Sequence, residues 1–321
     1  MNSLRHLFLI TVWCLTFLTP LSTLAAGIDY PIRPIQVIVG YPAGGGVDVM
    51  ARNLVNVMSN LLGQSMVVVN RDGASGAIGF GLLANANQDG YTLGAGPTTP
   101  ISIAPHLMKN LKYDVNSFEY ICQSFENVFT ITVAPDSAFK TIEELMAEAR
   151  LHPAKLTWGH AGIGTVPHLS VSNFAFRSPI NVTGVPYRGD APMLLDLISS
   201  RLSFGAPGIA TIANHNLRVL AVFAEKRHYA FPDAPTFKEL GLPSMPPGLN
   251  GLFAPKKTPQ AVLAKLENAC EKAVDSEAFK SGAKILNAQI AYLKGAAFRD
   301  RANEDYRYKG ELIRALNIHT E

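Results

Sequence analysis

Short apolar runs alternate along this chain with longer segments in which apolar residues recur at helical spacing. Met50, Leu54, Val57, Met58 and Leu61 are an example, because residues three or four apart share one face of a helix. The runs typical of strands are 35–39, 66–69, 91–94, 129–133, 156–158, 202–204 and 217–223. The segments typical of helices are 49–62, 78–85, 141–150, 169–176, 192–200 and 259–274. This alternation predicts an α/β fold with mainly parallel sheets.

A glycine-rich loop joins the first predicted strand to the helix that follows it. It places Tyr41, Pro42, Ala43, Gly44 and Gly45 at the start of that helix. Backbone N–H groups at a helix start carry positive partial charge, so the loop is a candidate anion site. No Gly-Lys-Ser/Thr follows and the glycines do not form G-x-G-x-x-G, which excludes the phosphate-binding loops. A small anion such as a carboxylate remains, with a tight turn that needs glycine only for its backbone angles as the alternative.

A second loop of the same kind lies about 120 residues further on, between a predicted strand and a predicted helix. Its candidate ligand-binding residues are Ala161, Gly162, Gly164, Thr165 and His168. In such folds ligands bind beyond the carboxyl ends of strands, where both loops fall. Two loops of this kind indicate two similar lobes, and a cleft between them could hold an anion from both sides. That geometry suits a binding protein as readily as an enzyme.

The N-terminal residues 1–26 predict a secretory signal peptide. Arg5 and His6 precede an apolar run over 7–18, and small residues permit cleavage after Ala25 or Ala26. The alternative is an uncleaved membrane anchor, although the run is short and no later stretch reaches about 18 apolar residues. We therefore expect a mature protein that is soluble in the periplasm.

Charge and cysteine content add little about function. The formal net charge is only +3, and no run of Lys and Arg occurs, so we expect no nucleic-acid partner. Cys270 lies on the apolar face of the helix predicted over 259–274, as a small buried hydrophobe would. In an exported protein it could form a disulfide with Cys122, but the sequence does not show that the two meet.

Six short motifs occur in a fixed order along the chain. They are Tyr41-Pro-Ala-Gly-Gly, 70–79, Asp89-Gly-Tyr-Thr-Leu93, Val185-Pro-Tyr-Arg-Gly189, 235–243 and 251–259. Together they resemble the Bug family, the extracytoplasmic solute receptors (TctC-like) of tripartite tricarboxylate transporters, over roughly residues 30–275. The resemblance implies a two-lobed periplasmic binding protein of the Venus-flytrap, type II-like class, with mixed sheets flanked by helices. It also implies a small carboxylate ligand, membrane transporter subunits as partners, a monomer, and no catalysis, cofactor or metal.

The resemblance and a proline-rich segment at 242–248 also predict how the lobes are assembled, with an ordinary surface turn as the alternative for that segment. We expect lobe one to be discontinuous, built from 27–128 plus 246–321. Lobe two is then formed by 129–245. The last 45 residues fit the family pattern least, so their role is left open.

Further candidate residues follow predicted strands or come from the resemblance. Thr98 and Thr99 follow the strand at 91–94, and Tyr187 and Asp190 precede the helix at 192–200. Arg188 could pair with a carboxylate, although a surface salt bridge is the commoner fate of a loop arginine. The resemblance aligns His168 with a family histidine, for which a structural hydrogen bond within the loop is the alternative to ligand contact. Asp48, in the first turn of the predicted helix, is expected to have a structural role.

The competing function is an exported hydrolase acting on a small carboxylate-containing substrate. Gly73-Ala-Ser-Gly-Ala77 is similar to a nucleophile elbow, but G-x-S-x-G requires glycine at position 77. His160 and His168 are eight residues apart without an H-E-x-x-H motif, so no metal site is expected. We therefore predict a receptor without catalytic residues, whose particular carboxylate the sequence does not name.

Overall fold

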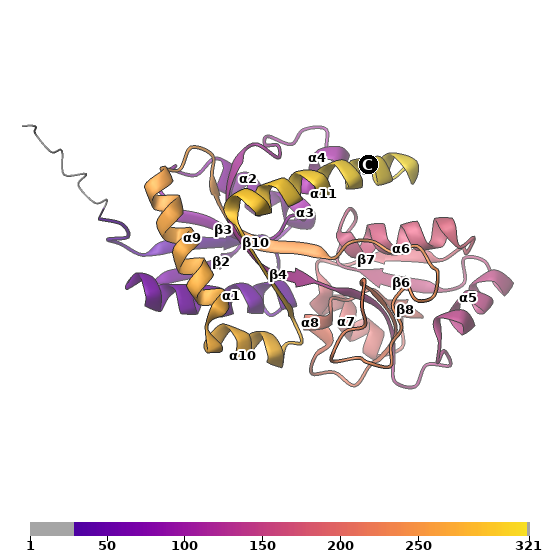
Figure 1. Cartoon of the computed structure of the whole chain (residues 1–321). Coiled ribbons are helices and arrows are strands. Elements are labelled where there is room, and N and C mark those ends of the chain that lie inside the picture. The colour runs from indigo at the N-terminus through magenta and orange to yellow at the C-terminus, as the bar shows by residue number, and fades with distance from the viewer. Residues whose placement is uncertain (1–28, 320–321) are drawn as a thin grey trace, which may run out of the picture.

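Two β-sheets divide the molecule into two lobes that lie side by side (Figure 1). The computed structural model describes residues 29–319, so the predicted signal peptide lies outside the described residues. We call the part around the six-stranded sheet the first lobe and the part around the five-stranded sheet the second lobe. Among residues 29–319, no helix is both long and apolar enough to cross a membrane.

The six-stranded sheet of the first lobe has the order β11-β4-β10-β3-β1-β2. Its strands are β1 (Ile35–Val39), β2 (Met66–Asn70), β3 (Thr92–Pro97), β4 (Phe118–Asn127), β10 (Gly248–Pro255) and β11 (Gln289–Lys294). β1 is parallel to β2 and β3, whereas β10 is antiparallel to β3 and β4. β11 is antiparallel to β4.

The five-stranded sheet of the second lobe has the order β7-β6-β8-β5-β9. Its strands are β5 (Phe129–Val133), β6 (Thr157–His160), β7 (Thr183–Pro186), β8 (Phe204–Gly205) and β9 (Arg218–Phe223). β6 is parallel to β7 and β8, and β5 is antiparallel to β8 and β9. Both sheets are therefore mixed, as the family resemblance implies.

The expectation of mainly parallel sheets, drawn from the alternation of strands and helices, is wrong. The antiparallel pairs of the first sheet involve β4, which leads through Val128 directly into β5 of the other sheet, and β10, which brings the chain back. Alternation detects only strand–helix–strand units between neighbours in the sequence. A strand that returns from the other lobe has no such local pattern, and its direction is set by the crossing.

Helices cover both sheets. They are α1 (Gly46–Leu62), α2 (Ala77–Ala84), α3 (Thr99–Ser102), α4 (Ala104–Leu107), α5 (Ile142–Leu151), α6 (Val166–Arg177), α7 (Asp190–Ile198), α8 (Ile209–Ile212), α9 (Gln260–Asp275), α10 (Glu277–Ile285) and α11 (Gly295–Ala315). A short 3₁₀ turn, η1 (Ala74–Gly76), precedes α2. Thr141 begins α5 by accepting a hydrogen bond from the backbone N–H of Glu144, which satisfies one free donor of the first turn.

The first core lies between α1, α9, α10 and the six-stranded sheet. Met50, Leu54 and Met58 are fully buried there, because their spacing places them on one face of α1. Cys122 of β4 and Cys270 of α9 form a disulfide in this core, with a Cα–Cα distance of 6.6 Å. The pairing that the sequence leaves open is thus present, and it closes a loop with a sequence separation of 148 residues.

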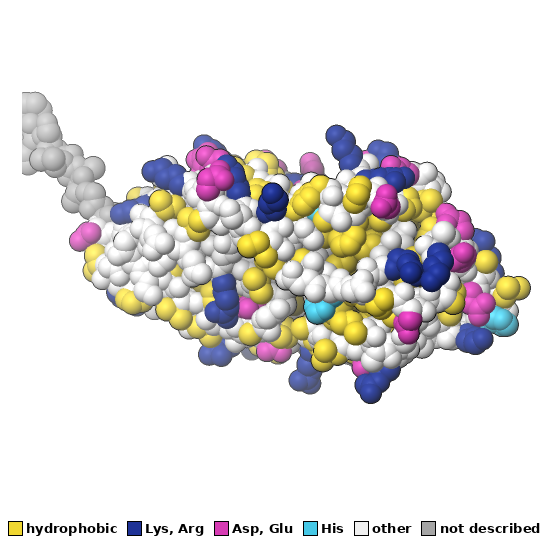
Figure 2. All heavy atoms as spheres, turned by 90° about the horizontal axis from the view of Figure 1, so that it is seen from below, with side chains coloured by type: hydrophobic (Ala, Val, Ile, Leu, Met, Phe, Trp, Pro, Cys, Tyr) yellow, Lys and Arg dark blue, Asp and Glu magenta, His cyan; other side chains and the backbone are white. Residues whose placement is uncertain are grey.

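The C-terminal helix α11 is shared by the two lobes. It starts on the first sheet and runs toward α6 of the second lobe (Figure 1). Leu312 and Ile313, near its end, belong to the hydrophobic core of the second lobe. On the face drawn in Figure 2, Lys and Arg side chains are interspersed with Asp and Glu. The surface therefore carries both signs of charge on this side.

Candidate functional site

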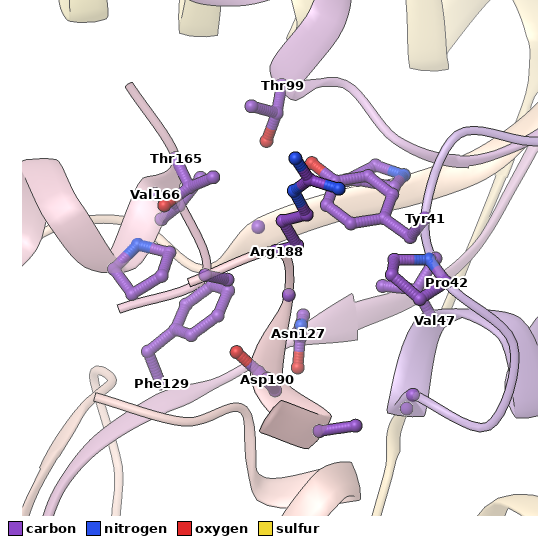
Figure 3. Close-up of a pocket in the computed structure, with 18 residues that line it drawn as sticks. Tyr41, Pro42, Val47, Thr99, Asn127, Phe129, Thr165, Val166, Arg188 and Asp190 are labelled. Atoms are coloured by element: carbon purple, nitrogen blue, oxygen red, sulfur yellow. The ribbon is translucent and has the colours of Figure 1, made fainter. Parts of the chain in front are cut away.

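A cavity lies where the two lobes face each other, beyond the carboxyl ends of β1, β3, β6 and β7 (Figure 3). With the open space at its mouth included, its volume is about 590 Å³. The first lobe contributes Tyr41, Pro42, Gly45, Val47 and Thr99 to its wall. The second lobe contributes Ala161, Thr165, Val166, Arg188 and Asp190. A ligand bound here would therefore contact both lobes.

Three helices begin at the wall of this cavity. α1 starts at Gly46, α6 at Val166 and α7 at Asp190, and all three residues line the cavity. The first N–H groups of an α-helix lack a partner within the helix and carry the positive end of its dipole. The fold thus directs three such helix ends at one space, which favours an anionic ligand.

The first glycine loop is held by Asp48. Gly44 has φ +83°, a left-handed conformation that favours glycine, and its N–H donates to Asp48 Oδ2 over 3.0 Å. Asn70 and Arg52 also donate to the Asp48 carboxylate. Burial opposes its ionisation, but the bonds from Arg52, Asn70 and Gly44 prevail and hold the pKa of Asp48 below its usual range. The structural role predicted for Asp48 is confirmed, and the Gly44 N–H is already in use.

Tyr41 and Thr99 form the polar part of the first lobe's wall. The Tyr41 hydroxyl donates to the carbonyl of Ser75 over 3.1 Å. Burial raises the pKa of Tyr41; a hydrogen bond with Thr99 acts against this, and the charge of Asp190 adds to it. Tyr41 is therefore a neutral hydroxyl, and its partners hold the ring at the cavity. Thr98 points away, because it is buried and donates to Asp305 on α11, which in turn pairs with the buried Lys309.

Two histidines hold the second glycine loop. The N–H of Gly162 donates to His160 Nδ1 over 3.3 Å, and the N–H of Gly164 donates to His168 Nδ1 over 3.4 Å. The Thr165 hydroxyl donates to the carbonyl of Gly162 over 2.7 Å. The hydrogen bond from Gly164 to His168 thus agrees with the alternative for this residue, a structural hydrogen bond within the loop. The loop N–H groups of Gly162 and Gly164, like that of Gly44, are satisfied within the loop.

Both histidines are neutral in this environment. Burial, with a smaller effect of the neighbouring His168, lowers the pKa of His160 to about 3, and burial lowers the pKa of His168 to about 4. Their ring centroids lie 4.6 Å apart beside Trp158, in a hollow separate from the cavity between the lobes. In the described part of the chain, no three His, Cys, Asp or Glu side chains gather as they would to hold a metal ion.

Arg188 and Asp190 give the cavity its two ionisable groups of opposite sign. Among the described residues that line it, Arg188 is the one basic and Asp190 the one acidic side chain. Asp190 Oδ2 accepts bonds from the N–H of Gly208 over 3.0 Å and from the hydroxyl of Thr211 over 3.1 Å. Burial nevertheless raises the pKa of Asp190, with those two bonds acting in the opposite direction.

The predicted site residues fall into three groups in the structure. Those that line the cavity are Tyr41, Pro42, Gly45, Thr99, Ala161, Thr165 and Asp190. Gly162 and Tyr187 line an adjoining hollow that shares Tyr41 with the cavity, and Tyr187 donates to Asp196. Those outside the cavity wall in this conformation are Ala43, Gly44, Thr98, Gly164 and His168. Ligand contact stays a prediction for all of them.

The wall also includes three residues at the crossings between the lobes that were not predicted from the sequence. Asn127 ends β4 and Phe129 begins β5, so both reach the cavity where the chain crosses between the lobes. Gly248 begins β10, where the chain returns. Neither crossing carries a glycine loop or a helix start, and no local signal marks it as part of a site.

The lobes touch each other around the cavity. Ser75 Oγ of the first lobe donates to the carbonyl of Ile163 in the second glycine loop over 2.7 Å. Ala210 of α8 packs into the core of the first lobe. An added Cβ on Gly46 would lie only 3.0 Å from Thr211 Oγ1, so the start of α1 approaches α8 closely. The structure therefore describes a closed arrangement of the lobes.

Two mixed α/β lobes closed over a cavity define a two-lobed solute-binding protein. The sequence matches the family model of the tripartite tricarboxylate transporter family receptor over residues 50–318. The chain belongs to this family of solute-binding receptors, which is not a family of enzymes. The family resemblance and the two-lobed fold predicted from the sequence are thereby confirmed, and the hydrolase alternative is set aside.

Relatives and solved structures agree with this assignment. BugT of Bordetella pertussis is 30% identical over 285 residues, which is 87% of each chain. A protein encoded in the gbd 5′ region of Cupriavidus necator is 31% identical over 292 residues, 90% of this chain and 89% of that protein. The periplasmic binding protein BugD superposes with a TM-score of 0.85 at 29% identity, covering 91% and 100% of the two chains. MatC from Rhodopseudomonas palustris, solved with bound malate, gives 0.82 at 26% identity, covering 88% and 100%.

Proposed function

We propose that this receptor captures a small carboxylate in the cavity between its lobes and delivers it to the membrane subunits of a tripartite tricarboxylate-type transporter. The observation that carries the proposal is the convergence of the starts of α1, α6 and α7 on one cavity. Each start offers N–H donors and positive partial charge, and no single lobe provides all three. The malate bound by the relative MatC supports a carboxylate ligand.

Arg188 supplies the full positive charge of the site. Its guanidinium can bind a carboxylate through two parallel N–H···O bonds, a geometry that fixes the orientation of the ligand. The hydroxyl of Thr99 faces the same space (Figure 3). The donors of this site are thus helix starts and side chains, rather than the glycine N–H groups that Asp48, His160 and His168 occupy.

We further propose that the protein works as a monomer in the periplasm, after removal of residues 1–26. Disulfides persist in oxidising compartments, and the buried Cys122–Cys270 disulfide supports export. We assign 27–128 plus 246–321 to lobe one and 129–245 to lobe two, with closure creating the surface that the transporter recognises. Cell fractionation that finds the full-length chain in the inner membrane would contradict the proposed location.

A thermal-shift screen tests the proposed function. The mature protein, starting at residue 27, is heated with a panel of mono-, di- and tricarboxylates. A carboxylate present at 100 times its Kd stabilises the folded state by about 2.7 kcal/mol, so at least one should raise the melting temperature by several degrees. Arg188→Gln should weaken that ligand's binding about 10- to 100-fold, because it removes the charge. A panel without any binder, or turnover of the ligand, would overturn the proposal.

A further inference from the structure

Asp190 carries an oxygen that nothing in the described structure satisfies. Its Oδ2 accepts two hydrogen bonds, from Gly208 and Thr211, but its Oδ1 is buried and has no hydrogen-bond partner among the described residues. Figure 3 places Asp190 beside Asn127, at the end of the cavity opposite Thr99. Asp190 lines the cavity. Buried polar atoms in proteins are nearly always paired, so its unpaired oxygen points to a partner supplied by the ligand.

The charge of Asp190 is also unpaired. No Lys, Arg or His nitrogen of the described residues forms an ion pair with it, although Arg188 is only two positions away in the sequence. The start of α7 and the donors from Gly208 and Thr211 favour a negative charge, but both of these hydrogen bonds reach Oδ2. An ionised carboxylate in such a place calls for a cation or a donor at its other oxygen.

The surroundings of Asp190 are closely packed. A Cβ on Gly208 would lie 2.4 Å from Asn127 Oδ1, so glycine is needed for Asn127 to lie over the turn that binds Asp190. Asn127 adds an amide to this end of the cavity. The wall also includes the apolar side chains of Val47, Phe129 and Val166. The cavity therefore has different polar groups at its two ends and apolar side chains in its wall.

We propose that the ligand is an amino carboxylate, which presents a protonated amine to Asp190 Oδ1 and a carboxylate to Arg188 and the helix starts. The inference rests on the proposed function and names the ligand class for the same cavity. A ligand hydroxyl would supply a hydrogen bond to Oδ1 but no charge. A protonated amine supplies both, and so compensates the buried carboxylate more completely.

Matched ligand pairs test the inference by calorimetry on the mature protein. The pairs are butyrate and 2-aminobutyrate, succinate and aspartate, and glutarate and glutamate, with malate and 2-hydroxyglutarate as hydroxyl counterparts. In the pair whose carbon skeleton fits the cavity, we expect the amine to bind about 10- to 100-fold more tightly than the parent acid. We also expect it to bind more tightly than the hydroxy acid.

Asp190→Asn provides the decisive variant. An asparagine oxygen can still accept the bonds from Gly208 and Thr211, while the negative charge is lost. We expect the preference for the amine to fall below threefold, with binding of the parent acid retained. Asp196→Asn is the matched control, because Asp196 lies on the same helix but bonds to Tyr187 and Arg201 outside the cavity. This variant should prefer the amine over the parent acid as strongly as the wild type does.

Three results separate the inference from the proposed function. Equal binding of amine and parent acid by the wild type would overturn the inference and leave a carboxylate receptor. A hydroxy acid that binds as tightly as the amine, or a preference that survives Asp190→Asn, would also overturn it. If no carboxylate of any kind binds, the proposed function itself fails.

Discussion

A side chain at Gly46 should hold the two lobes apart. Gly46 begins α1 in the first lobe, and its backbone is outside the left-handed region, so a larger residue is not strained by its own conformation. An added Cβ would lie 3.0 Å from Thr211 Oγ1 and 3.1 Å from the Cβ of Ala210, both on the second lobe. Valine adds two further methyl groups at this contact. Gly46→Val therefore opposes the closed arrangement and leaves the interior of each lobe unchanged.

The size of the effect follows from the cost of overpacking. Forcing extra carbon atoms into a packed contact costs about 1–3 kcal/mol. Here the lobes can separate to avoid that cost, so it appears as a smaller population of the closed, binding-competent form. The apparent Kd for the carboxylate should rise about 5- to 150-fold, with little change in the free energy of unfolding of the ligand-free protein.

Calorimetry and small-angle scattering measure the two consequences of this change. Gly46→Val should bind more weakly and keep a larger radius of gyration at a ligand concentration that closes the wild type. Gly81→Val on α2 is the control, because its Cβ would meet only the Tyr113 ring at 3.8 Å, an ordinary contact within the first lobe. A Gly46→Val protein with wild-type affinity and a closed scattering profile would refute the reasoning.

Three further predictions concern the disulfide, the contact between the lobes and the histidines. Replacing both Cys122 and Cys270 by alanine should cost about 5 kcal/mol by loop-closure entropy for a separation of 148 residues, or about 8 °C in melting temperature; a loss under 2 °C would contradict this. Ser75→Ala removes a hydrogen bond between the lobes and should weaken ligand binding about 2- to 12-fold by calorimetry, whereas unchanged affinity would show that the bond does not stabilise closure. His160 and His168 have folded pKa values of about 3 and 4, below the ordinary 6.5, so the unfolded chain takes up protons first and stability should fall as the pH drops from about 6.5 toward 4. Denaturant unfolding at several pH values measures the slope of the free energy of unfolding against pH. The double variant His160→Asn/His168→Asn should reduce this slope by at most about 1.4 kcal/mol per pH unit for each histidine. An unchanged slope would exclude the two histidines as its source.

Strands with a local hydrophobic signal could be predicted from the sequence, and the two first-lobe strands at the crossings between the lobes could not. β1 and β5 begin and end at the predicted residues, 35–39 and 129–133. β4 and β10 were not predicted, although both are almost wholly buried. Neither sequence keeps a regular alternation of apolar and polar residues, by which the equally buried β5 is recognised, and β10 also contains two glycines and an asparagine.

The candidate site was located in part because glycine loops and helix starts have a sequence signature. The loops at Tyr41 and Ala161 do border the cavity. The sequence could not show which loop N–H groups are free to bind a ligand. This depends on where the side chains of Asp48, His160 and His168 lie in the folded loops.

The positive φ angles show that glycine is also required for the turns themselves. They are +83° at Gly44, +130° at Gly162 and +73° at Gly164. Valine at these positions would strain the backbone. Weaker binding by such a variant would therefore not show that the ligand approaches the loop backbone. Asn127 and Phe129 reach the site only through the crossing of the chain between lobes, which no local pattern reveals.

The most direct test of the account is a crystal structure of the mature protein with the carboxylate that gives the largest thermal shift. We predict that the ligand lies between the lobes, with its carboxylate at Arg188 and the starts of α1 and α6. We also predict contacts from both lobes in the same complex. A ligand bound to one lobe alone, or outside the cavity that Tyr41 and Asp190 line, would contradict the central claim.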